Sequence, residues 1–349
     1  MARTQFHPLR VAAVEALTDD AVALTFEVPP ELRDVFAFAP GQSLTLKRGE
    51  ERRSYSICAP AGRAPRIGVR EVAGGAVSGW LVHEVGPGDT IEVQAPGGTF
   101  TPDLSTAAHH VLIAAGSGIT PVLSIAASVL AASPVSTVTL FYGNRRAGSV
   151  MFADDVADLK DAHPARMRLV HVLSREPQEV ELFTGRLDAA KLRTLLPVSI
   201  DVAAVDQWWL CGPFGMVTDA IDVLKDFGVP GERIHRELFY VEDVPPPQAQ
   251  HEEPPPGPGA EVTVILDGRS TTTTIPPDVP VLDGAQLVRP DLPFACKGGV
   301  CGTCRALVTH GAVRMRRNYA LEQDELDDGY VLTCQALAIT DAVTIDYDS

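Results

Sequence analysis

Three cysteines lie within nine residues in the C-terminal part of the chain. Cys296, Cys301 and Cys304 have the spacing C-x4-C-x2-C, and Cys334 supplies a fourth thiol from a more distant segment. Zinc sites usually present their ligands as two close pairs, a pattern that Cys334 does not complete. The spacing is instead typical of plant-type [2Fe–2S] clusters. The sequence therefore predicts a cluster bound by these four thiols, with structural zinc or buried free thiols as the alternative.

Glycines separate these cysteines. Gly298, Gly299 and Gly302 occupy three of the six positions between the three close thiols. Glycine lets the backbone turn so that its N–H groups face the sulfurs, which offsets the negative charge of a cluster. We expect this loop to wrap around the metal centre.

Two further glycine turns have the residue types of a nucleotide site. "AAGSGITP" (114–121) follows an apolar strand and opens a helix, and "LCGPFGM" (210–216) repeats this arrangement. Such turns present backbone amides and a helix N-terminus to a pyrophosphate, although Pro121 replaces the third glycine of the full fingerprint. Cys211 is either a small buried residue or a surface for nicotinamide.

A third stretch combines a charge, an aromatic ring and hydroxyls. In "RRSYSICAP" (52–60), alternation along a strand places Arg53 and Tyr55 on one face and two serines on the other. An ordinary barrel strand is the alternative interpretation. The turn "GGAVS" (74–78) is a weaker candidate for binding a phosphate with its backbone amides.

The elements that position these motifs fall into three domains. Residues 1–105 carry short apolar runs between Pro-Gly and Gly-Gly turns, which predicts an antiparallel β-barrel. Residues 106–240 alternate strands with helices, which predicts a doubly wound parallel sheet. Residues 261–349 are compact and rich in strands. The Pro-rich segment 241–260 is predicted to be a semi-extended linker.

In this order the motifs resemble the ferredoxin–NADP reductase superfamily joined to a C-terminal plant-type ferredoxin of the β-grasp fold. The resemblance implies an FAD site formed by Arg53, Ser54, Tyr55, Ser56, Gly74, Gly75, Val77, Ser78 and, in "HRELF", Phe239. It implies a pyridine-nucleotide site formed by Gly116, Gly118, Thr120, Cys211, Gly212 and Pro213. It also implies that Ser56, Cys211 and Glu237 are the catalytic residues beside the reacting rings. FMN is the alternative flavin, since some reductases with this domain order use it.

The choice of nicotinamide rests on basic residues after two predicted strands. Ser174 and Arg175, with Arg145 or Arg186 nearby, are expected to bind a 2′-phosphate, which favours NADPH. Glu176 is adjacent and suits the free hydroxyl of NADH, so NADH stays open.

The predicted activity is that of an oxidoreductase, which passes electrons from NADPH through FAD and the cluster to an oxygenase. Within the superfamily, "YGNRR", "CGPFGM" and "CKGGVCGTCRA" resemble the reductase subunits of di-iron phenylacetyl-CoA ring epoxidases. Reductases of Rieske-type oxygenases, such as the 3-ketosteroid 9α-hydroxylases, are the alternative. A redox-sensing carrier without a substrate is a second alternative.

The net charge and the hydropathy of the chain exclude some classes of binding partner. The formal net charge of −16 disfavours nucleic acid. Residues 261–349 hold 13 acidic and seven basic residues, which predicts a basic docking surface on the oxygenase. No apolar run is long enough to span a bilayer, and the N-terminus lacks the apolar stretch of a signal peptide, so we expect a cytoplasmic protein without a membrane partner.

Overall fold

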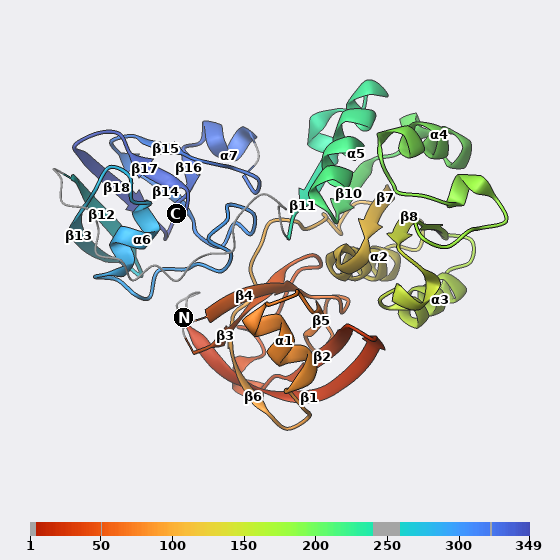
Figure 1. Cartoon of the computed structure of the whole chain (residues 1–349), viewed down its shortest axis with the longest axis horizontal. Helices are drawn as coiled ribbons and strands as arrows, with labels where there is room; N and C mark the ends of the chain where they lie inside the picture. The colour runs from red at the N-terminus through yellow and green to blue at the C-terminus, as the bar shows by residue number, and fades with distance from the viewer. Residues whose placement is uncertain (1–4, 50, 240–258, 322) are drawn as a thin grey trace. The chain divides into compact units, whose positions relative to one another are not determined.

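The computed structural model describes residues 5–49, 51–239, 259–321 and 323–349. Residues 6–51 and 55–239 belong to one compact unit, and residues from 259 onward belong to a second. Figure 1 labels the elements of both units. All but the last two residues of the predicted linker, 241–260, lie outside the described residues.

The first domain is the predicted antiparallel barrel. Its strands follow the order β4-β3-β6-β1-β2-β5. Ile57, directly after β4, forms a bridge with Ile67 in β5, so the two edges of the sheet meet at this corner. Alternating side chains such as Leu9 and Val11 fill its core. The bounds are β1 Phe6–Thr18, β2 Ala21–Glu27, β3 Ser43–Arg48, β4 Glu51–Ser56, β5 Arg66–Arg70, β6 Thr90–Gln94 and helix α1 Ala76–His83.

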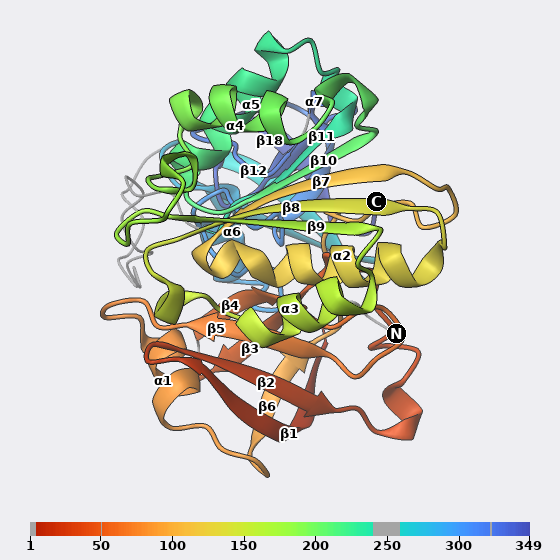
Figure 2. The same ribbon diagram turned by 90° about the vertical axis from the view of Figure 1, so that its right-hand side faces the viewer.

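The second domain is the predicted doubly wound sheet. Its five strands are parallel and follow the order β11-β10-β7-β8-β9. Figure 2 shows α2 and α3 on one face of this sheet and α4 and α5 on the other. The bounds are β7 His109–Ala115, β8 Thr137–Asn144, β9 Met167–Leu173, β10 Gln207–Cys211, β11 Ile234–Glu237, α2 Ile119–Ala132, α3 Ala153–Ala162, α4 Ala189–Ser199 and α5 Phe214–Asp226.

The barrel packs against α2 and α3 through a shared apolar cluster, which includes Ala23 of β2 and Val122 of α2, and through polar contacts. Ser124 of α2 donates a hydrogen bond of 2.6 Å to the carbonyl oxygen of Ala59. Arg66 at the start of β5 forms ion pairs with Asp155 of α3, at 2.5 Å, and with Glu15 of β1, at 2.7 Å. Ser124 and Asp155 thereby join α2 and α3 to the barrel, and the Glu15 ion pair holds Arg66 within the barrel.

The C-terminal domain is built on a five-stranded sheet of order β13-β12-β18-β14-β16, in which β12 and β18 are parallel. Cys304 and Cys334 belong to its core. The bounds are β12 Ala260–Leu266, β13 Arg269–Ile275, α6 Val281–Gln286, β14 Arg305–His310, β15 Val313–Met315, α7 Gln323–Asp327, β16 Tyr330–Leu332, β17 Ala336–Ala338 and β18 Ala342–Asp346. Within the described ranges, no helix combines the length and the apolarity needed to cross a bilayer.

The two glycine turns of the parallel sheet touch each other. Chain order reverses between β7 and β10, so the turns after these strands lie side by side at the switch point. A Cβ added to Gly118 would lie 2.1 Å from the carbonyl oxygen of Cys211 and 2.8 Å from the backbone nitrogen of Gly212. Only glycine allows the two backbones to approach this closely.

We predict that Gly118→Ala lowers the free energy of unfolding by about 2 kcal/mol, because backbone atoms must move to admit the methyl group. Gly215→Ala, in α5, is the matched control, since nothing lies within 4 Å of its added Cβ. Urea denaturation of both variants measures the difference. Equal stability of the two variants would contradict the close approach.

Candidate functional site

The three predicted catalytic residues come together where the barrel meets the parallel sheet. Ser56, the last residue of β4, donates a hydrogen bond of 2.9 Å from Oγ to Oε2 of Glu237. Glu237 ends β11 and is the register partner of Cys211 at the end of β10. Ser56 and Cys211 are buried. A hydroxyl, a carboxyl and a thiol from three strands therefore share one small region.

Burial sets the charge of these groups. Removal from water raises the pKa of Glu237 to about 7, although the Ser56 hydrogen bond acts in the opposite direction. Burial, and then the neighbouring Glu237, raises the pKa of the Cys211 thiol well above its usual range. Near pH 7 the thiol is neutral, whereas the carboxyl takes up and releases a proton.

The rest of the R-x-Y-S stretch lies along β4. Tyr55 packs against the barrel core. Arg53 and Ser54 are half-buried, and Arg53 donates a hydrogen bond of 2.6 Å to the carbonyl oxygen of Arg52. Side chains of this strand therefore supply a cation and an aromatic ring immediately before Ser56.

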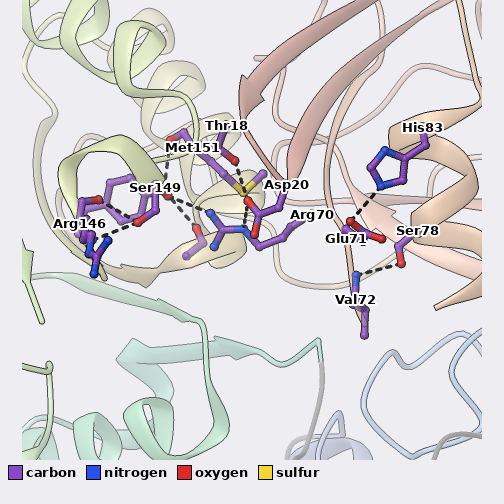
Figure 3. A network of polar contacts seen from close by, with 12 residues as sticks. Thr18, Asp20, Arg70, Glu71, Val72, Ser78, His83, Arg146, Ser149 and Met151 are labelled. Atoms are coloured by element: carbon purple, nitrogen blue, oxygen red, sulfur yellow. Dashed lines mark hydrogen bonds and ion pairs between the residues drawn. The ribbon is translucent and has the colours of Figure 1, made fainter. Parts of the chain in front are cut away.

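The "GGAVS" turn leads into α1. The N-cap residue of this helix is Gly75, which has no side chain to accept hydrogen bonds from the first backbone amides. These amides are therefore suited to bind an anion. The Ser78 hydroxyl accepts a hydrogen bond of 3.1 Å from the Val72 amide (Figure 3). It also donates one of 3.3 Å to the carbonyl oxygen of Gly75. Ser78 therefore closes the turn with its side chain, Gly74 takes the left-handed conformation at a φ of +73°, and the Val77 side chain packs in the barrel core.

The turn after β7 has the same character. Gly116 begins a short 3-10 turn, and α2 follows without a side-chain cap. Thr120 is buried and donates a hydrogen bond of 3.0 Å to the carbonyl oxygen of Ser117. Gly212 and Pro213 lead into α5, whose N-terminus also lacks a side-chain cap. Two adjacent helix N-termini therefore fit a pyrophosphate.

Arg70, at the end of β5, is a candidate site residue that the sequence motifs did not indicate. Its Nη2 donates a hydrogen bond of 2.8 Å to the carbonyl oxygen of Ser149, and its Nε lies 3.4 Å from Oδ1 of Asp20 (Figure 3). Its Nη1 lies 3.1 Å from the position that a Cβ of Gly116 would take. Arg70 thus brings a cation from the barrel to the first glycine turn. The only signal in the sequence is an arginine four residues before the Gly-Gly pair.

The predicted 2′-phosphate residues lie together at the ends of β8 and β9. The amide of Ser174 donates a hydrogen bond of 2.9 Å to the carbonyl oxygen of Asn144, and that of Arg175 donates one of 2.8 Å to Arg145. Both arginines are exposed. The carboxylate of Glu176 accepts a hydrogen bond of 2.8 Å from the Ala147 amide and so secures the neighbouring loop.

Phe239, a predicted residue of the flavin site that lies two residues after Glu237, is 38% exposed.

The four clustered cysteines form two pairs. The Cys296 side chain lies next to that of Cys301, and the Cys304 side chain lies next to that of Cys334. The amide of Gly298 donates a hydrogen bond of 3.3 Å to Sγ of Cys296, as the glycine spacing predicts.

Two thiol pairs are what a centre with two irons requires, so this donor set fits a [2Fe–2S] cluster.

Known protein families match most of the chain. Residues 8–101 match the oxidoreductase FAD-binding domain, and residues 112–222 match the oxidoreductase NAD-binding domain. Residues 264–338 match the 2Fe-2S iron-sulfur cluster binding domain. The predicted fold class and the three cofactor types, FAD, a nicotinamide nucleotide and a [2Fe–2S] cluster, are confirmed.

Full-length relatives define the class further. The chain is 42% identical to the E subunit of 1,2-phenylacetyl-CoA epoxidase from Escherichia coli K12, over 99% of both chains. It is 33% identical to the ferredoxin reductase component of 3-ketosteroid-9-alpha-monooxygenase from Rhodococcus rhodochrous, over 97% of this chain and 96% of the relative.

The fold has a solved counterpart. Phthalate dioxygenase reductase is 22% identical, with a TM-score of 0.60 and coverage of 98% of both chains. The identities of 42% and 33% to full-length relatives show that the chain belongs to the family of flavin- and iron–sulfur-containing reductases of multicomponent oxygenases, as its motifs predict.

The raised pKa of Glu237 predicts a specific pH dependence of stability. Because the folded pKa, about 7, exceeds the usual carboxyl value, the folded chain holds this proton to higher pH than the unfolded chain. The free energy of unfolding therefore falls as pH rises from about 4.5 to 7, by up to about 1.4 kcal/mol per pH unit. Glu237→Gln should abolish this component in urea denaturation.

The exposed Glu232 provides the control. Glu232→Gln should keep the wild-type dependence on pH, because its side chain is in water in both states. An unchanged pH profile for Glu237→Gln would show that this carboxyl does not titrate as its burial predicts.

Proposed function

We propose that this chain is the reductase of a di-iron oxygenase that epoxidises the ring of phenylacetyl-CoA. Residues 1–105 would bind FAD, residues 106–240 NADPH, and residues 261–349 the cluster, with 241–260 as linker. The observation that carries the proposal is the identity of 42% to a phenylacetyl-CoA epoxidase component along the full length of both chains. The junction of Ser56, Cys211 and Glu237 supports it with groups suited to hydride transfer.

The chain's own groups would prepare the flavin site. FAD, when bound, accepts a hydride from nicotinamide and releases the electrons singly to a one-electron carrier. The Glu237 carboxyl would hold a proton that exchanges near pH 7, while Ser56 donates its hydroxyl hydrogen to Oε2 of the same group. Cys211 stays neutral and would offer an uncharged surface to the nicotinamide ring.

Backbone and cationic groups would hold the two pyrophosphates. Arg53 and the N-terminal amides of α1, from Gly74 to Ser78, suit the pyrophosphate of FAD, and Tyr55 supplies a ring for stacking. The turns that contain Gly116, Gly118, Thr120, Gly212 and Pro213 suit the pyrophosphate of the nicotinamide nucleotide. Arg70 adds a positive charge beside the second site.

NADPH is the proposed donor because of the charges after β8 and β9. Arg145 and Arg175 are adjacent and exposed, and Ser174 lies between them and the end of β9. The carboxylate of Glu176 is occupied by the Ala147 amide rather than presented to a ribose hydroxyl. The guanidinium groups of Arg145 and Arg175, together with the Ser174 hydroxyl, suit a 2′-phosphate.

We expect Arg175→Ala to raise KM for NADPH about tenfold, the loss of one charge-assisted contact, and to leave KM for NADH unchanged. Steady-state kinetics with both nucleotides measure the effect. Arg193→Ala is the control, because this exposed arginine of α4 pairs with Asp226 and should change neither constant. Equal losses with NADPH and NADH would exclude recognition of the 2′-phosphate.

The oxygenase partner is proposed from the net charge of residues 261–349 and from the similarity of the chain to reductases of known oxygenases. The excess of acidic residues in 261–349 suits a basic docking surface on the oxygenase, so electron delivery should weaken as ionic strength rises. A Rieske-type oxygenase is the second candidate, because the 3-ketosteroid monooxygenase reductase is also similar over its full length.

Reconstitution tests the proposal. The purified chain, NADPH and O₂ are combined with a phenylacetyl-CoA epoxidase oxygenase or with a 3-ketosteroid oxygenase. We expect consumption of phenylacetyl-CoA coupled to NADPH oxidation in the first mixture. Turnover in the second mixture alone would overturn the di-iron assignment. Failure to reduce even cytochrome c would favour a redox sensor over a reductase.

A further inference from the structure

Gln335 follows the fourth cysteine and is 7% exposed. Its Nε2 donates two hydrogen bonds, one of 2.9 Å to the carbonyl oxygen of Lys297 and one of 3.4 Å to Sγ of Cys334. An amide nitrogen carries two hydrogens, so one group satisfies both acceptors. The side chain of Gln335 therefore joins the fourth thiol to the residue that follows the first, Cys296.

Lys297 holds an unusual conformation that this contact helps to maintain. Its φ of +50° lies in the left-handed region, which costs free energy for any residue with a side chain. Its Nζ binds Asp283 Oδ1 at 2.8 Å and Gln286 Oε1 at 2.9 Å, while Gln335 binds its carbonyl oxygen. Lys297 is thus fixed at its side chain and its backbone, between Cys296 and the glycines.

Gln335 itself has little freedom to move. Its amide donates to the carbonyl oxygen of Leu332 at 2.8 Å, and its own carbonyl accepts from the Arg316 amide at 2.9 Å. Its Cγ lies 3.1 Å from the position of a Cβ at Gly299. Backbone bonds and this tight packing direct the carboxamide toward the sulfur.

We propose that Gln335 is a positioning residue that raises the reduction potential of the [2Fe–2S] cluster through its hydrogen bond to Cys334. Uptake of one electron adds one negative charge, part of which falls on the cysteine sulfurs. An N–H directed at a sulfur stabilises that form more than the oxidised form. The inference rests on the cluster ligands proposed above, and a potential can be measured whichever oxygenase the chain serves.

The test is a redox titration of the holoenzyme followed by EPR of the reduced cluster. Gln335→Met keeps the volume and removes the donor, and Gln335→Glu also adds a negative charge. We expect both potentials to become more negative, with the reduction equilibrium of Gln335→Met about tenfold less favourable, or about 59 mV for one electron. Gln335→Glu should shift further.

Gln323→Glu is the matched control. It adds the same charge to the same domain, but the Gln323 amide is exposed and bonds Asp327 rather than a cysteine sulfur. Its potential should equal that of the wild type. A wild-type potential in Gln335→Met, with full iron content, would overturn the proposal.

A measurement on the wild-type holoenzyme covers the case in which variants fail to assemble. With nitrogen-15 placed in glutamine side chains, pulsed EPR of the reduced cluster should detect a coupled amide nitrogen, because Nε2 lies 3.4 Å from Sγ of Cys334. Absence of this coupling would show that the hydrogen bond does not reach the cluster.

Discussion

The nucleotide-binding half of this protein depends on one close approach between two backbones. The turn that contains Gly118 presses against the carbonyl group of Cys211, with no room for a Cβ between them. This contact brings the N-termini of α2 and α5 together at the point where strand order reverses. It also fixes the end of β10, and so places Cys211 beside Glu237. The pair of helix N-termini and the position of Cys211 beside Glu237 follow from the same constraint.

The barrel completes this edge by supplying polar groups that the parallel sheet lacks. Ser56 binds Glu237, Arg70 binds the loop after β8 through Ser149, and Arg66 pairs with Asp155. Each contact joins a strand of the barrel to a different element of the sheet domain. Because a hydrogen bond or ion pair loses strength steeply with distance, these contacts hold the two domains in a defined register.

The C-terminal domain solves a different problem, which is to hold four thiols that carry negative charge once metal is bound. Folding pairs Cys304 of the loop with Cys334 of a distant segment, within the core. Donors then converge on the sulfurs, from the Gly298 backbone and from the Gln335 side chain. Amide donors of this kind lower the cost of burying that charge. The same contacts that shape the loop therefore act on its chemistry.

The three-domain fold class could be predicted from the sequence, because the Cys296–Cys304 spacing, the glycine turns and the alternation of strand and helix are local patterns. Arg70 and Gln335 could not, since each acts on a segment that is distant in sequence, and each looks like an ordinary polar residue. The closure of its own turn by Ser78 and the bond from Glu176 to a loop were equally hidden. Such contacts depend on the tertiary fold, because a polar side chain takes its role from the partner that folding brings within hydrogen-bonding distance.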